Sequence, residues 1–244
     1  MKAERHDTTI IGGGVAGLSA ATFTARHGLD TLVVDSGDSI LRRNAHLENF
    51  PGFPAGVNAR RLLDLLGEQA EAAGATRHEA TVTEVTRTDE GFVVETDEDD
   101  RYRTEYVVAA TKNEVGYLGD IDGVGVIERG KAFVDVDERG RTGVEGLYAA
   151  GRLAEKPHQA IVCAGHGAEV GATLLEDDDR PFYHDWVAPE GYFTDRGRDL
   201  PPGCEEIDDE ERERREDASL EAVRDRFAEP HPDEQETHPS LRRD

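Results

Sequence analysis

The stretch Thr8-Thr-Ile-Ile-Gly-Gly-Gly-Val-Ala-Gly-Leu-Ser-Ala-Ala21 decides the fold. Its β-branched start predicts a short buried strand, and the alanine-rich residues 18–27 predict a helix that ends at Gly28. Thr31-Leu-Val-Val34 then restores strand character and is followed by Asp35. The chain is therefore expected to open with a βαβ unit.

Gly12, Gly14 and Gly17 form the pattern G-x-G-x-x-G between this strand and this helix. In such a motif the first glycine permits a tight turn, the second lets a pyrophosphate approach the backbone, and the third lets helix and strand pack closely. The N-terminus of the helix offers N–H groups and its positive dipole end to the phosphates. Asp35 suits the hydroxyls of a ribose and would repel a 2′-phosphate, which disfavours NADP. The motif predicts a dinucleotide site and does not distinguish FAD from NAD.

The rest of the first 175 residues alternates between strand and helix patterns. Residues 36–56 are rich in Gly, Pro and Asn, which predicts irregular backbone, and Asn58 is expected to cap a helix that ends near Ala73. Residues 81–106 alternate like antiparallel strands that turn at Gly91 and at residues 97–100. Further strands are expected at 106–110, 132–136 and 146–151, and a helix at 159–175.

The composition excludes several classes of protein. The chain has 244 residues, 28 Lys+Arg against 53 Asp+Glu, a formal net charge of −25 and two cysteines. The negative field disfavours nucleic-acid binding, the few cysteines exclude a disulfide scaffold, and the short apolar runs predict no membrane span. With no apolar signal core at its start, the protein is expected to be cytoplasmic. A lysine-poor, carboxylate-rich surface is typical of a halophile; an acidic partner-binding tail is the alternative.

Residues 176–244 differ in character from the residues before them. They contain 24 Asp+Glu and 10 Arg, and five aromatic residues lie between Phe182 and Phe193. We expect a domain at 1–175 and an acidic C-terminal extension at 176–244. Within the extension, residues 182–207 are expected to wrap over the domain, residues 208–228 to form a solvated helix, and the last 15 or so to be mobile.

Four segments, in this order, resemble the thioredoxin reductase family of flavoproteins. They are Thr9–Ala21, Glu48–Pro54, Val107–Thr111, and Gly146–Gly151 with His158–Ile161. The resemblance covers about residues 6–175 and implies an α/β, three-layer Rossmann-like FAD-binding domain made of a parallel sheet, helices and an antiparallel β layer. The FAD contacts that it implies are Gly12, Gly14, Ala16, Gly17, Asp35, Asn49, Ala110, Gly151, Gln159 and Ala160. Arg152 is added to them as a candidate contact of the pyrophosphate.

Two substitutions depart from the family pattern inside the implied site. Ala110-Thr111-Lys112 stands where the family has Ala-Thr-Gly, and Gly151-Arg152 stands where it has Gly-Asp. The family's aspartate accepts a hydrogen bond from a ribityl hydroxyl, whereas Arg152 can only donate. Arg152 therefore either contacts the pyrophosphate or weakens the flavin site, and both interpretations stay open.

A deletion is the larger departure. Family members insert a nicotinamide-binding domain, on the order of 100 residues, before the segment that matches Phe133–Val136. Here residues 112–132 leave 21 positions, and the redox Cys-x-x-Cys of that domain is missing too. Thioredoxin reductase activity is therefore not expected.

His158 and Cys163 are the candidate catalytic residues, because the resemblance brings both to the flavin. Protonated His158 would stabilise a reduced flavin anion or relay protons, and a helix N-terminus would lower the pKa of the Cys163 thiol. The simpler interpretations are a loop histidine and a buried helical cysteine. We expect no metal site.

The predicted function is that of an FAD-binding oxidoreductase without its own NAD(P)H domain. Its electrons would be exchanged with a partner protein or with a small substrate that docks on the flavin. The alternative is a non-catalytic flavin- or nucleotide-binding protein for interaction or sensing, and NAD is the weaker choice of nucleotide. The family resemblance also suggests a homodimer.

Overall fold

The computed structural model describes residues 3–241 of the protein. The chain divides into two compact units. The first comprises the residues up to Asp178 together with those from Gln235 onward, and the second is Asp179–Glu234.

A seven-stranded sheet forms the centre of the first unit. Its order is β3-β2-β1-β6-β5-β4, and β9 also pairs with β6. Strands β1, β2, β3, β6 and β9 run parallel to one another. Many of their buried residues are β-branched, such as Ile10, Val33 and Val107, as is typical of parallel strands covered on both faces. The bounds are β1 Glu4–Ile11, β2 Thr31–Asp35, β3 Thr76–Glu79, β6 Arg101–Ala109 and β9 Leu147–Ala149.

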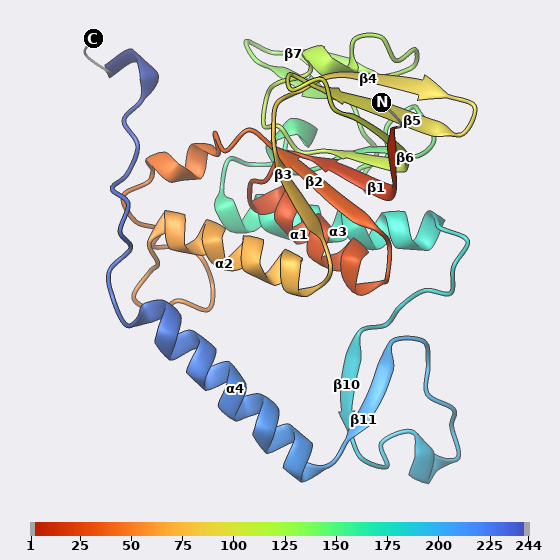
Figure 1. Cartoon of the computed structure of the whole chain (residues 1–244), viewed down its shortest axis with the longest axis vertical. Helices are drawn as coiled ribbons and strands as arrows, with labels where there is room; N and C mark the ends of the chain where they lie inside the picture. The colour runs from red at the N-terminus through yellow and green to blue at the C-terminus, as the bar shows by residue number, and fades with distance from the viewer. Residues whose placement is uncertain (1–2, 242–244) are drawn as a thin grey trace. The chain divides into compact units, whose positions relative to one another are not determined.

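Three helices lie together on one side of β1, β2 and β3, and β4, β5 and β7 lie on the other (Figure 1). They are α1 Val15–Arg26, α2 Ala59–Ala72 and α3 Ala160–Asp177. The side chain of Asn58 caps α2 by accepting from the N–H groups of Arg60 and Arg61 at 2.9 and 3.2 Å, as the sequence predicts. These layers confirm the expected fold class.

The antiparallel layer is hydrogen-bonded to the parallel sheet. Strands β4 (Val82–Thr88) and β5 (Gly91–Thr96) form a hairpin, and β5 pairs with the first half of β6. The separate strand expected at 106–110 is wrong, because β6 runs without a break from Arg101 to Ala109. Its first half alternates between exposed and buried residues beside β5, and its second half is buried between β1 and β9.

Short elements connect the main ones. The segment expected to be irregular contains the 3-10 helix η1 (Ile40–Arg43). Residues 112–132 hold only the 3-10 helix η2 (Gly116–Leu118) and strand β7 (Val126–Glu128), which pairs with β8 (Ala132–Val134). After β9 the 3-10 helix η3 (Gly151–Ala154) leads toward α3.

The second unit contains a small parallel sheet and a long helix. Strands β10 (Trp186–Pro189) and β11 (Cys204–Ile207) pair, with the 3-10 helix η4 (Thr194–Arg196) between them. The rings of Trp186, Tyr192 and Phe193 pack edge-to-face against one another, with centroids 4.7 to 5.4 Å apart. The aromatic cluster thus has packing partners inside its own unit, and the expected wrap over the first domain stays a prediction.

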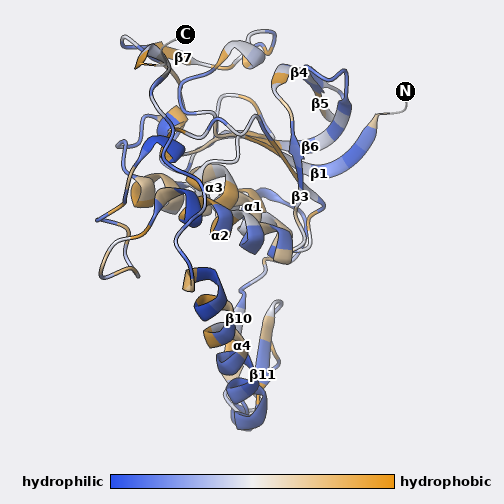
Figure 2. Ribbon diagram, turned by 60° about the vertical axis from the view of Figure 1, so that its left-hand side comes forward, coloured by the Kyte–Doolittle hydropathy of each residue, from blue (hydrophilic) through white to orange (hydrophobic). Residues whose placement is uncertain are grey.

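Helix α4 (Asp209–Phe227) matches the predicted solvated helix. The carboxylate of Asp208 caps it by accepting from the N–H of Glu211 at 2.8 Å, and none of its residues is buried. Figure 2 shows α4 as mostly hydrophilic with scattered hydrophobic positions. The chain then reaches the 3-10 helix η5 (Pro239–Leu241). The predicted mobility of the last residues stays a prediction, and 242–244 lie outside the described residues.

Candidate functional site

A pocket of about 750 Å³ opens where β1, β2 and β6 end in the first unit. In parallel sheets, ligands bind beyond the carboxyl ends of the strands, where helices also begin. The pocket brings together predicted residues that are up to 151 positions apart in the sequence. Those that line it are Gly12, Gly14, Ala16, Asp35, Asn49, Ala110, Arg152, His158, Gln159, Ala160 and Cys163. Gly17 and Gly151 lie behind this lining.

The glycines of the turn differ in what surrounds them. Gly12 has φ +108°, a conformation that favours glycine, and its N–H donates to the carbonyl oxygen of Val34 at 2.8 Å. A Cβ on Gly17 would overlap the carbonyl oxygen of Gly12. A Cβ on Gly14 would meet only the Ser39 hydroxyl, at 3.7 Å. The backbone at Gly14 is therefore open to a ligand, while Gly17 closes the packing of α1 on β1.

Asp35 lies at the carboxyl end of β2 and lines the pocket beside the glycine turn. Its carboxylate packs so closely against Gly13 that a Cβ there would come within 2.6 Å of an Asp35 oxygen. This places an acceptor where the motif requires one for a ribose diol.

Two helices begin at the pocket. Gly14 precedes α1 and Gln159 precedes α3, neither side chain caps its helix, and neither helix has an acidic residue in its first turn. The Asn49 amide donates to the Gln159 side-chain oxygen at 2.7 Å, so the irregular segment after β2 is joined to the start of α3. The N–H groups of both helix starts can therefore serve an anionic or carbonyl-bearing ligand.

Gly151, behind the lining, is held by a histidine that the sequence analysis did not select. Its N–H donates to Nδ1 of His166 at 3.0 Å, and its φ is +64°. His166 is buried, and burial together with the charge of Lys156 lowers its pKa to about 4. The imidazole is therefore neutral near pH 7 and fixes the backbone between β9 and η3.

Arg152 reaches the pocket with part of its guanidinium already engaged. Nη1 donates to the carbonyl oxygen of Lys156 at 3.0 Å, and the guanidinium carbon lies 4.6 Å from the centre of the Phe133 ring. Stacking on an aromatic ring is a common arrangement for arginine. The side chain is thus positioned by the protein, with its charge at the pocket wall.

The environments of His158 and Cys163 favour their uncharged forms. Partial burial lowers the pKa of His158, and the nearby charges of Lys112, Arg152 and Lys131 lower it further. Burial raises the pKa of Cys163, whose Sγ lies 3.5 Å from the Pro157 carbonyl oxygen. The lowered thiol pKa expected from the helix N-terminus is therefore wrong, because desolvation outweighs the backbone hydrogen bonds and the Arg152 charge that lower the pKa.

Lys112 is a second residue that the sequence analysis did not select as a ligand contact. It lines the pocket and has φ +66°, a left-handed conformation that lysine rarely adopts. Partial burial lowers its pKa, with contributions from Lys131 and Arg43. The only sequence signal for this residue is its replacement of the family's glycine.

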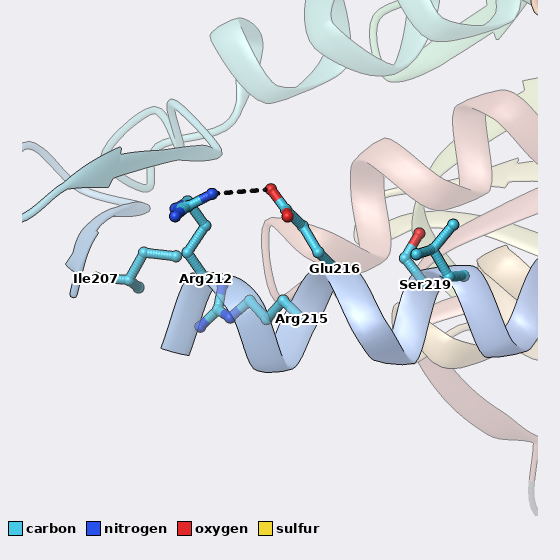
Figure 3. Close-up of a pocket in the computed structure, with 6 residues that line it drawn as sticks. Ile207, Arg212, Arg215, Glu216 and Ser219 are labelled. Carbon is cyan, nitrogen blue, oxygen red and sulfur yellow. Dashed lines mark hydrogen bonds and ion pairs between the residues drawn. The ribbon is translucent and has the colours of Figure 1, made fainter. Parts of the chain in front are cut away.

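A second hollow of about 450 Å³ lies within the second unit, along α4. Figure 3 shows it lined by Ile207, Arg212, Arg215, Glu216 and Ser219. Arg212 pairs with Glu216 at 3.3 Å, and Arg215 pairs with Glu205 at 2.7 Å. These ion pairs account for the charges of the hollow without a ligand.

His78 is the centre of a cluster that resembles a metal site. Its Nε2 lies 3.3 Å from a carboxylate oxygen of Asp100 and 3.8 Å from one of Glu98. All three side chains are at least partly exposed, and exposed acidic groups commonly cluster without a metal ion.

The families that match this chain cover residues of the first unit, which contains the pocket. Residues 59–167 match the family "Pyridine nucleotide-disulphide oxidoreductase", and residues 10–68 match "NAD(P)-binding Rossmann-like domain". Thioredoxin reductase of Aquifex aeolicus is 42% identical over 72 residues, which are 29% of this chain and 22% of that protein. The chain is thioredoxin reductase-like. These matches confirm the predicted resemblance and indicate FAD as the cofactor.

Relatives and solved structures differ in how much of them is matched. Dihydrolipoyl dehydrogenase of Haloferax volcanii is 30% identical over 196 residues, 76% of this chain and 37% of that protein. The chain thus covers little more than a third of that relative's length. A thioredoxin reductase from Gloeobacter violaceus superposes with a TM-score of 0.64 at 18% identity, covering 76% of this chain and 100% of that one, which supports the fold. Among residues 3–241, no helix has the length and apolar character that crossing a membrane requires.

Proposed function

We propose that the protein is an FAD-dependent oxidoreductase without a nicotinamide domain of its own, whose electron partner is a small molecule or a redox protein that reaches the flavin directly. The observation that carries the proposal is the convergence of the glycine turn, Asp35, and the Asn49–Gln159 pair in one pocket. When bound, FAD would supply hydride or electron transfer.

Different residues of the pocket would bind different parts of FAD. Asp35 would bind the ribose of the adenosine half, and the open backbone at Gly14 with the start of α1 would bind the pyrophosphate. Gln159 and Ala160, at the start of α3, would face the flavin half, with Asn49 held against Gln159. His166 would act indirectly by fixing the backbone at Gly151.

The source of electrons follows from the short segment between β6 and β8. Residues 112–132 form η2 and β7, and a βαβ unit for a second nucleotide does not fit there. Reducing equivalents would therefore arrive from outside this chain. Relatives named thioredoxin reductase favour a redox protein and a dimer in a cytoplasmic setting, and relatives from haloarchaea favour work in high salt.

A non-catalytic flavin protein for sensing or interaction is the second candidate. Two residues favour this candidate. The raised pKa of the Cys163 thiol keeps it protonated, and Arg152 is a cation engaged with a backbone carbonyl, so neither side chain supplies an obvious redox or acid–base group. The two candidates differ in whether the flavin exchanges electrons with soluble molecules.

An anaerobic redox cycle tests the proposal. The bound flavin is reduced by light with a sacrificial donor, and its absorption is followed after addition of ferricyanide or a quinone. We expect full reoxidation within seconds and repeated turnover when the donor is resupplied. A bound flavin that stays inaccessible to both acceptors would favour the non-catalytic candidate.

A further inference from the structure

Three of the chain's four lysines are associated with one end of the pocket. There are four, Lys2, Lys112, Lys131 and Lys156, in a protein with a net charge of −25. Lys112 lines the pocket, Lys131 acts electrostatically on both Lys112 and His158, and the carbonyl oxygen of Lys156 holds Arg152. Lys112, Lys131 and Arg152 thus place positive charge at the end of the pocket where β6 ends and η3 begins, against the negative net charge of the whole chain.

Of the residues that the structure describes, four carboxylates line the pocket, and none of them is paired with Lys112 or Arg152. Asp35 and Asp38 follow β2, on the side of the adenosine half. Glu48 pairs with His46 at 2.8 Å, and Glu114 accepts from the N–H of Gly116 at 2.9 Å. Within residues 3–241, no carboxylate forms an ion pair with Lys112 or Arg152.

The backbone at Lys112 shows that the lysine is costly to hold there. A residue other than glycine in the left-handed region costs on the order of 1 kcal/mol or more. Lysine has no short polar side chain that could bond locally and reduce this cost, unlike Asp99, which adopts φ +63° in the hairpin between β5 and β6. Strained residues of this kind concentrate at ligand sites.

We propose that Lys112 and Arg152 bind the anionic group, a carboxylate or a phosphate, of the small molecule that exchanges electrons with the flavin. Lys131, which acts electrostatically on Lys112 and His158, adds to the attraction. This inference rests on the proposed function and adds to it the chemical class of the substrate. Arg152 supplies a planar fork fixed by Phe133 and by the Lys156 carbonyl, and Lys112 supplies a half-buried point charge.

The same chemistry could come from the pyrophosphate of the cofactor. The start of α1 and the open backbone at Gly14 already offer that group a site. If Lys112 serves a second anion, its charge is needed for that anion and is dispensable for FAD. The two sources therefore separate in a measurement that follows both ligands.

Two variants of Lys112 and one control make the test. Lys112→Gln removes the charge and keeps the left-handed backbone, and Lys112→Gly removes both the charge and the strain. Asp99→Gly relieves the same backbone conformation outside the pocket. For each protein, FAD content is measured after purification, and citrate and inorganic phosphate are titrated at constant ionic strength while the flavin absorption is recorded, with glycerol as the neutral comparison.

We expect citrate or phosphate to shift the flavin spectrum of the wild type, and glycerol to leave it unchanged. Both Lys112 variants should keep FAD and bind the anion at least tenfold more weakly. Lys112→Gly and Asp99→Gly should unfold at higher denaturant concentration than the wild type, and Asp99→Gly should keep wild-type anion affinity.

Three results would overturn the inference. Loss of FAD from Lys112→Gln would assign the lysine to the cofactor's phosphates, and the proposed function would stand. Anion affinity unchanged in both variants, or no anion effect on the wild-type flavin, would leave the lysine without this role. Absence of FAD from the wild type would instead refute the proposed function itself.

Discussion

His166 connects the acid stability of the protein to the cofactor pocket. Its imidazole is buried, it accepts a hydrogen bond from Gly151 through Nδ1, and its pKa lies at about 4. In the unfolded chain a histidine titrates near its usual 6.5. The folded state therefore binds this proton less readily, so the contribution of His166 is fully present above pH 6.5 and is lost as the pH falls toward 4.

We predict that this residue makes the free energy of unfolding about 3 kcal/mol smaller at pH 4 than at pH 7. The measurement is urea unfolding at several pH values for the wild type and His166→Gln, because the difference between the two removes the titration of the many carboxylates. The control is His46→Gln, which changes a largely exposed imidazole. Parallel pH profiles for the wild type and His166→Gln would contradict the assignment.

For single residues, the sequence predicts a function where that function depends on neighbours close in the chain. Gly12, Gly14 and Asp35 are readable because their spacing within one βαβ unit defines their job. Lys112 and His166 are not readable in this way. The left-handed conformation of Lys112 is atypical of lysine, and the partner of His166, Gly151, lies 15 residues away in the sequence. The direction of the Cys163 pKa also depends on burial, which local sequence does not report.

Helix α3 packs against α1 through glycine, and this contact positions both helix starts at the pocket. A Cβ on Gly167 would overlap the carbonyl oxygen of Ala16, and one on Gly171 would come within 2.9 Å of the Phe23 Cβ. Gly165, two residues earlier on the same helix, has no atom within 4 Å of its would-be Cβ. Glycine is therefore required at position 167 and only tolerated at position 165.

Alanine substitutions at Gly165 and Gly167 should change stability in opposite directions. Gly165→Ala should stabilise the protein by about 0.5 to 1 kcal/mol, because alanine is the better helix former. Gly167→Ala should destabilise it by about 2 kcal/mol or more, because backbone has to move. Denaturant unfolding of both variants measures the change in the free energy of unfolding. Equal effects of the two substitutions would contradict the close contact between Gly167 and Ala16.

Most elements follow from sequence periodicity, and the exceptions have a physical reason. Strand β1 begins at Glu4 rather than near Thr8, because polar residues Glu4, Arg5 and His6 extend the pairing with β6. Strand β6 combines two patterns, alternating beside β5 and continuously apolar between β1 and β9. A change of environment along one strand looks like two strands when only the sequence is read.

For the whole molecule, composition marks residues 176–244 as distinct, while the structure divides the chain after Asp178 and returns the residues from Gln235 onward to the first unit. The return is visible in a hydrogen bond from the N–H of Glu236 to the carbonyl oxygen of Arg42, at 3.0 Å. Such a backbone contact leaves no pattern in the sequence. A domain at 1–175 with an extension at 176–244 remains our proposal for the organisation of the chain.

The nucleotide that the intact protein carries after purification in high salt tests the central claim most directly. Heat release followed by mass analysis should identify FAD, close to one per chain, together with a flavin absorption spectrum. Gly14→Val should fold and lose most of the FAD, because a Cβ at this pocket-lining position meets only the Ser39 hydroxyl, at 3.7 Å, while the larger side chain takes space that the pyrophosphate needs. A colourless wild-type protein that takes up no added FAD, or one that releases NAD instead, would contradict the account.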